Sequence, residues 1–156
     1  MSQTSKINIV VLSRADSLEN WQAEAIRQVK ALAFAEIVLV IEDATAQSSQ
    51  PTFGKRVINY QWKRLFWNRW FRKAGHVAAT SSVSTRNVFG NIPVLNVVPE
   101  LHGKYSQHFS SNDVATVKSY EPDVIIRFGF NILRGEILNV AKHGIWSYHH
   151  ADHRVI

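Results

Sequence analysis

The chain has 156 residues, no cysteine and six more lysines and arginines than aspartates and glutamates, and 46% of its residues are hydrophobic. This length is typical of one domain with its own core, and the apolar content argues against disorder. The absence of cysteine excludes a disulfide scaffold and any zinc or iron–sulfur site built on thiolates. No apolar run reaches the roughly 18 residues of a spanning helix, and Ile7–Leu12 is too short for a signal-peptide core. We therefore expect one cytoplasmic domain over residues 1–156 with no membrane span.

The first forty residues predict a strand, a helix and a second strand. Ile7–Leu12 is a β-branched apolar run, typical of a strand buried on both faces. Asp16, with Glu19 three residues later, has the spacing of a helix N-terminus, and the apolar periodicity predicts a helix that ends near Phe34. Ile37–Ile41 is a second buried strand. This order predicts a βαβ unit with two parallel strands.

The positive charge is concentrated in the middle of the sequence. Between Ala44 and Pro99 there is no acidic residue, whereas eight lysines and arginines occur there. Residues 55–73 interleave these bases with aromatic side chains, and Tyr60–Lys73 is predicted to be helical. Such a helix either packs its aromatic side on the sheet or binds anions. One alternative function is therefore a non-catalytic basic α/β module that binds RNA or an anionic membrane surface through residues 55–73.

The second half alternates strands and helices again. The predicted elements are a strand over Pro93–Val98, a helix from Asn112 or Asp113 to Tyr120, a strand over Val124–Ile126, a short helix over Arg134–Lys142 and a last strand over Ile145–His149. The whole pattern predicts an α/β fold of three layers with a doubly wound, mainly parallel sheet. Trp146 is expected in the core, on the face opposite to Ser147.

Two phosphate-binding motifs are missing from the sequence. The loop after the first strand, Ser13–Ser17, has no glycine, and neither G-x-G-x-x-G nor G-x-x-x-x-G-K-[ST] occurs. Without glycines the backbone cannot approach a pyrophosphate closely, which disfavours a site for NAD or a nucleoside triphosphate.

A dense polar cluster follows the last predicted strand. Alternation places Ser147 and His149 on one face of that strand, at the carboxyl edge where open α/β sheets keep their sites. A metal site made of His149, His150, Asp152 and His153 is a weak alternative, because adjacent histidines on a strand diverge. We expect no metal.

Four short motifs follow one another in the last third of the chain: Glu121–Ile126, Gly129–Leu133, Glu136–Leu138 and Gly144–His149. Their order resembles the amino-terminal catalytic domain of the folate-dependent formyltransferases, which include glycinamide ribonucleotide, methionyl-tRNA and sugar-nucleotide formyltransferases. The resemblance covers about Tyr120 to His150. It is most similar to the sugar-nucleotide members and implies a Rossmann-like fold.

The resemblance implies transfer of a formyl group from 10-formyltetrahydrofolate to a small amine acceptor that can carry phosphate, such as an amino sugar on a nucleotide. In the family, the loop that matches Phe130, Asn131, Ile132 and Leu133 lines the pterin pocket, largely through backbone groups.

The resemblance also implies two catalytic residues. His149 matches the catalytic histidine of the family, and Ser147 stands where the family has asparagine. Together they would stabilise the oxyanion and move protons. The family's later aspartate would follow Ile156. The resemblance thus implies a domain that lacks its C-terminal continuation, with weak or no activity in a chain that lacks that segment.

Overall fold

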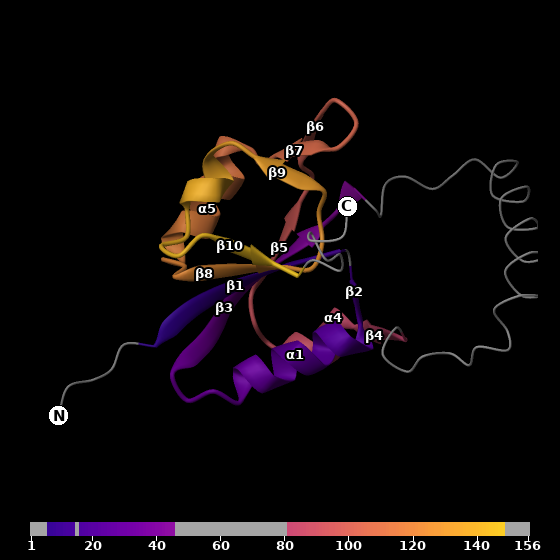
Figure 1. Cartoon of the computed structure of the whole chain (residues 1–156), viewed down its shortest axis with the longest axis vertical. Helices are drawn as coiled ribbons and strands as arrows, with labels where there is room; N and C mark the ends of the chain where they lie inside the picture. Colours follow the sequence, from indigo (N-terminus) through magenta and orange to yellow (C-terminus); the bar gives the residue numbers. More distant parts are fainter. Residues whose placement is uncertain (1–5, 15, 46–80, 149–156) are drawn as a thin grey trace, which may run out of the picture.

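The computed structural model of the chain describes residues 6–14, 16–45 and 81–148. Its centre is a sheet of five strands, all parallel to their neighbours, in the order β10-β8-β1-β3-β5 (Figure 1). These strands are β1 (Ile7–Ser13), β3 (Ala35–Asp43), β5 (Val94–Val97), β8 (Val124–Arg127) and β10 (Ile145–Ser147). The predicted α/β class and the predicted parallel pairing of the first two long strands are confirmed.

Helices lie on both sides of this sheet. Figure 1 shows α1 (Asn20–Lys30) and α4 (Thr85–Phe89) below it, and α5 (Ser111–Ser119) above it; the 3₁₀ turn η2 (Glu136–Asn139) belongs to the α5 side. Successive residues of β1 alternate between the two cores. Val10 and Leu12 pack in the cluster that contains α5, whereas Ile9 and Val11 pack in the cluster that contains α1. Because both faces are covered, the strand is apolar at every position from Ile9 to Leu12.

Five short strands form two smaller sheets beside the main one and were not predicted. β2 (Ser17–Glu19) pairs antiparallel with β4 (Ser82–Ser84). A separate three-stranded sheet contains β6 (Glu100–His102), β7 (Ser106–His108) and β9 (Ile132–Arg134). Runs of three residues are too short to show an alternating pattern, so only their distant pairing partners reveal them.

Several predicted helix boundaries were wrong. α1 is capped by Glu19, whose N–H donates to Gln22 Oε1 at 2.9 Å, and not by Asp16. Residues Ser17–Glu19 form strand β2, which pairs with β4, so the helix begins only at Asn20. It ends at Lys30 instead of near Phe34. The cap of α5 is Ser110, whose Oγ accepts from Asp113 N–H at 3.1 Å.

Two predictions near the C-terminus were also wrong. The helix expected over Arg134–Lys142 is only the 3₁₀ turn η2, because Arg134 ends strand β9. Trp146 is not in the core: it is 60% exposed and donates its Nε1–H to the carbonyl of His143 at 3.1 Å. It lies on β10, the last strand of the main sheet, and within the part of the chain that the structure describes no strand pairs with the other side of β10.

Some predictions fall outside the described residues. They are the helix over Tyr60–Lys73, the basic segment 55–73, the catalytic candidate His149 and the other residues of the alternative metal site, His150, Asp152 and His153. Within the described ranges, no helix is long and apolar enough to cross a bilayer.

Candidate functional site

The strand order changes direction between β1 and β8. From β1 the sheet continues through β3 to β5 on one side and through β8 to β10 on the other. In open parallel sheets, ligands bind at such a point, outside the carboxyl ends of the strands, because the loops there leave toward opposite faces. A cavity of about 350 Å³ occupies this position. Its lining comes from the ends of β1, β3 and β8 and from the small sheet: Arg14, Asp43, Thr45, Leu101, Gln107, Phe128, Gly129, Phe130 and Asn131.

The loop after β8 lies directly against the end of β1. The N–H groups of Phe128 and Gly129 both donate to the carbonyl of Leu12, at 2.9 and 3.1 Å. A Cβ atom on Gly129 would lie 2.5 Å from the backbone nitrogen of Arg14. Only glycine therefore allows this approach, which fixes where the loop enters the cavity wall.

A buried glutamine fixes the far end of this loop. Gln107, on β7, is only 2% exposed. Its Oε1 accepts from the N–H of Asn131 at 2.5 Å, and its Nε2 donates to Asp43 Oδ2 at 3.5 Å. The other carboxylate oxygen of Asp43 accepts from the N–H of Thr45 at 2.9 Å and from the Thr45 hydroxyl. A continuous hydrogen-bonded chain thus joins the end of β3 to Asn131.

Arg127 connects the same loop to the last strand. Its guanidinium donates to the carbonyl of Asn131 at 2.6 Å and to Ser147 Oγ at 3.3 Å. Arg127 and Ser147 are paired positions of β8 and β10. Ser147 accepts this hydrogen bond, and among the described residues its hydroxyl has no acceptor, so the proton can be donated to a ligand.

The backbone of Phe130 has a conformation that is rare for a residue with a side chain. Its φ angle is 64°, in the left-handed region, which costs on the order of 1 kcal/mol for such a residue. Ring packing against Phe109 at 5.3 Å and the hydrogen bonds of the next residue, Asn131, hold it there. Strained residues of this kind cluster at functional sites.

Three aromatic residues from separate elements meet at the same edge of the sheet. The Trp21 ring on α1 lies 5.7 Å from that of Phe128 and 5.3 Å from that of Tyr148. Tyr148 follows β10 and is 66% exposed. Such rings can contact a flat ligand through their apolar faces.

The four residues predicted to bind the cofactor have three different environments. Phe130 and Asn131 line the cavity. Ile132 is 48% exposed and is not part of its lining, whereas Leu133 is 6% exposed and packs in the core on the α5 side. Strand β9 explains this split, because consecutive residues of a strand point to opposite faces. Of the two catalytic candidates, Ser147 lies at the end of β10 and contacts Arg127.

Sequence reasoning missed the residues that support this loop. Gln107 and Asp43 belong to no sequence motif, because their roles depend on a hydrogen bond between distant strands. The sequence did offer a signal for Arg127, because it is a single charged residue directly after the apolar run Val124–Ile126.

No protein-family model and no curated protein matches this sequence. The resemblance to the formyltransferases therefore stays a prediction that depends on the motifs between Tyr120 and His150.

Proposed function

We propose that this chain is a formyltransferase-type domain with a doubly wound, Rossmann-like three-layer fold. In this proposal it binds 10-formyltetrahydrofolate in the cavity at the ends of β1 and β8 and transfers the formyl group to the amine of a small acceptor. The observation that carries the proposal is that Phe130 and Asn131, from the loop that matches the family's pterin loop by resemblance, line an open cavity at the strand reversal.

The cavity offers groups that suit a pterin with an anionic tail. Phe128 and Phe130 contribute flat apolar surface. The backbone N–H and carbonyl of Asn131 are already used by Gln107 and Arg127. The side-chain amide of Asn131 and the guanidinium of Arg14 make no hydrogen bond within the described residues, so both can serve a ligand. Arg14 supplies the positive charge for a carboxylate or phosphate of either substrate.

The proposed reaction is an acyl transfer. The acceptor amine attacks the formyl carbon, and negative charge develops on the formyl oxygen. The Ser147 hydroxyl donates to this oxygen while it accepts from Arg127, and a hydrogen bond from a cation makes a hydroxyl a stronger donor. In this scheme His149 accepts the proton of the attacking amine, the bond from the formyl carbon to the folate nitrogen breaks, and that nitrogen takes up a proton.

Calorimetric titration with a non-reactive folate analogue tests the proposal. We expect one binding site per chain, with affinity reduced roughly three- to tenfold in Asn131→Ala, because the cavity loses a polar side chain. Asn139→Ala is the matched control, since Asn139 is exposed in η2 and does not line the cavity. A folded chain that binds no folate analogue, or equal affinities for the two variants, would falsify the proposal.

A further inference from the structure

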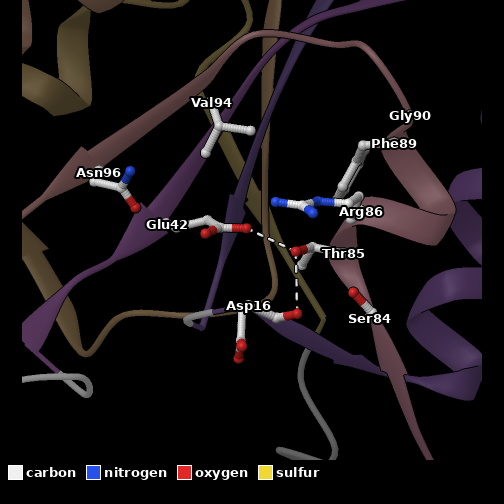
Figure 2. Close-up of a pocket in the computed structure, with 9 residues that line it drawn as sticks. All are labelled: Asp16, Glu42, Ser84, Thr85, Arg86, Phe89, Gly90, Val94 and Asn96. Carbon is white, nitrogen blue, oxygen red and sulfur yellow. Dashed lines mark hydrogen bonds between the residues drawn. The ribbon is translucent and has the colours of Figure 1, made fainter.

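A second cavity of about 410 Å³ lies beside β3 and β5, where α4 begins (Figure 2). Its polar lining includes Glu42, Thr85, Arg86 and Asn96. None of these residues lines the first cavity. The second cavity is therefore a distinct candidate for a ligand site.

Glu42 is the unusual residue of this cavity, because it is a carboxylate with only 8% of its surface exposed. Its Oε1 accepts from the Thr85 hydroxyl at 2.8 Å, and Thr85 is held in turn by the backbone carbonyl of Asp16. No other described residue donates to the carboxylate, and Figure 2 shows it directed into the cavity. Oε1 is therefore already hydrogen-bonded, whereas Oε2 makes no hydrogen bond within the described residues and can accept from a ligand that enters the cavity.

The neighbouring groups define which ligand fits. Asn96 is the register partner of Glu42 in the parallel β3–β5 pair, so both side chains lie on the same face. Val94, two residues earlier, shares that face and adds apolar surface. Arg86 extends its guanidinium from α4 toward Glu42 and Val94, and no carboxylate of the described residues forms an ion pair with it (Figure 2).

A vicinal diol matches this set of groups. Each hydroxyl of a diol can donate to Glu42 Oε2 and accept from the Asn96 amide or from Arg86. An acidic side chain at the end of the second strand of an open parallel sheet is also where nucleotide-binding folds hold the ribose hydroxyls. The glycine-free loop after β1 disfavours a pyrophosphate and thus a dinucleotide. A volume of about 410 Å³ lies within the usual range of small-molecule sites.

We infer that this cavity binds a ribonucleoside or its monophosphate. Glu42 and Asn96 hold the ribose diol, and Arg86 faces the phosphate where the ligand carries one. The inference does not depend on formyl transfer, because it uses only the residues of this second cavity.

The test is a calorimetric titration of the chain with the four ribonucleoside 5′-monophosphates, their parent nucleosides and the 2′-deoxy counterparts. We expect at least one ribonucleotide to bind, its 2′-deoxy form to bind at least about tenfold more weakly, and Arg86→Ala to weaken the monophosphate more than the nucleoside. The nucleoside and its monophosphate carry the same ribose diol. A larger loss for the monophosphate in Arg86→Ala would therefore show that Arg86 faces the phosphate.

The decisive variant is Glu42→Gln. Its side-chain oxygen still accepts from Thr85, but an NH₂ donor replaces the free acceptor, so we expect about a tenfold or greater loss of ribonucleotide affinity. Glu36→Gln on the same strand is the matched control, because Glu36 is exposed and, among the described residues, its side chain pairs only with Lys6, at 3.2 Å. Circular dichroism verifies that both variants fold.

Equal affinity of Glu42→Gln and the parent chain overturns the inference. Equal binding of ribo- and deoxyribonucleotides, or no nucleotide binding by the folded parent chain, also overturns it. The folate-analogue titration on the same sample keeps the two proposals apart. A chain that binds the folate analogue but no ribonucleotide contradicts only this inference, and the reverse result contradicts only formyl transfer.

Discussion

The guanidinium of Arg127 donates to the hydroxyl oxygen of Ser147 at 3.3 Å, across paired positions of β8 and β10. The same guanidinium donates to the carbonyl of Asn131 at 2.6 Å. One side chain therefore fixes both the end of the last strand and the loop that lines the first cavity. Arginine can do this because its planar head carries N–H groups in several fixed directions.

Replacing Arg127 by lysine should abolish at least one of its hydrogen bonds to Ser147 and Asn131. A single ammonium group cannot reproduce both directions, so we expect folate-analogue affinity to fall roughly three- to tenfold in Arg127→Lys, measured by calorimetry. Arg134→Lys is the control, because Arg134 is exposed at the end of β9 and its side chain makes no hydrogen bond to other described residues. Equal affinities for the two variants would show that Arg127 does not position the loop.

Gln107 should be important for stability because this buried side chain links the buried carboxylate of Asp43 to the backbone of Asn131. Gln107→Leu leaves the N–H of Asn131 and Oδ2 of Asp43 without this partner. We expect the free energy of unfolding to fall by about 2–4 kcal/mol, measured by urea denaturation. In Gln28→Leu, on the exposed face of α1, the change should stay within about 0.5 kcal/mol. A loss in Gln107→Leu no larger than in the control contradicts this prediction.

Gly129→Ala tests the close approach of β1 and the loop after β8. The added methyl group would lie 2.5 Å from backbone atoms of Arg14 and Ser13, so the backbone must move, at a cost of about 1–3 kcal/mol. Gly103→Ala is a useful comparison, because its φ of 74° is unfavourable for alanine but no atom lies within 4 Å, which predicts about 1 kcal/mol. Thermal or urea unfolding should rank Gly129→Ala as the less stable variant, and the reverse order would count against steric crowding.

Ile132 and Leu133 should behave differently although they are neighbours in the predicted cofactor loop. Leu133→Ala removes a side chain that packs in the core and should lower the free energy of unfolding by about 2–5 kcal/mol. Ile132→Ala changes a half-exposed position and should cost less than about 1 kcal/mol. Urea denaturation of both variants measures this difference. Similar losses would mean that the alternation along β9 does not control their environments.

The long central strands could be predicted from the sequence alone. Ile7–Leu12 and Ile37–Ile41 are apolar at nearly every position because both faces of a parallel sheet are covered by helices. The same local pattern predicted the βαβ order and the parallel pairing of β1 with β3. The loop Phe130–Leu133 was found through its motif, but the motif could not separate the cavity residues from the core residue Leu133.

Contacts between distant residues decided the rest. The β2–β4 pairing moved the start of α1 to Asn20, and the β3–β5 register placed Asn96 beside Glu42. Likewise, the β8–β10 pairing brought Arg127 to Ser147. Hydrophobic periodicity is a local property that each segment carries by itself, so the sequence determined which segments form the buried sheet. Polar neighbours depend on which strands pair and in which register, and only the folded chain fixes that choice.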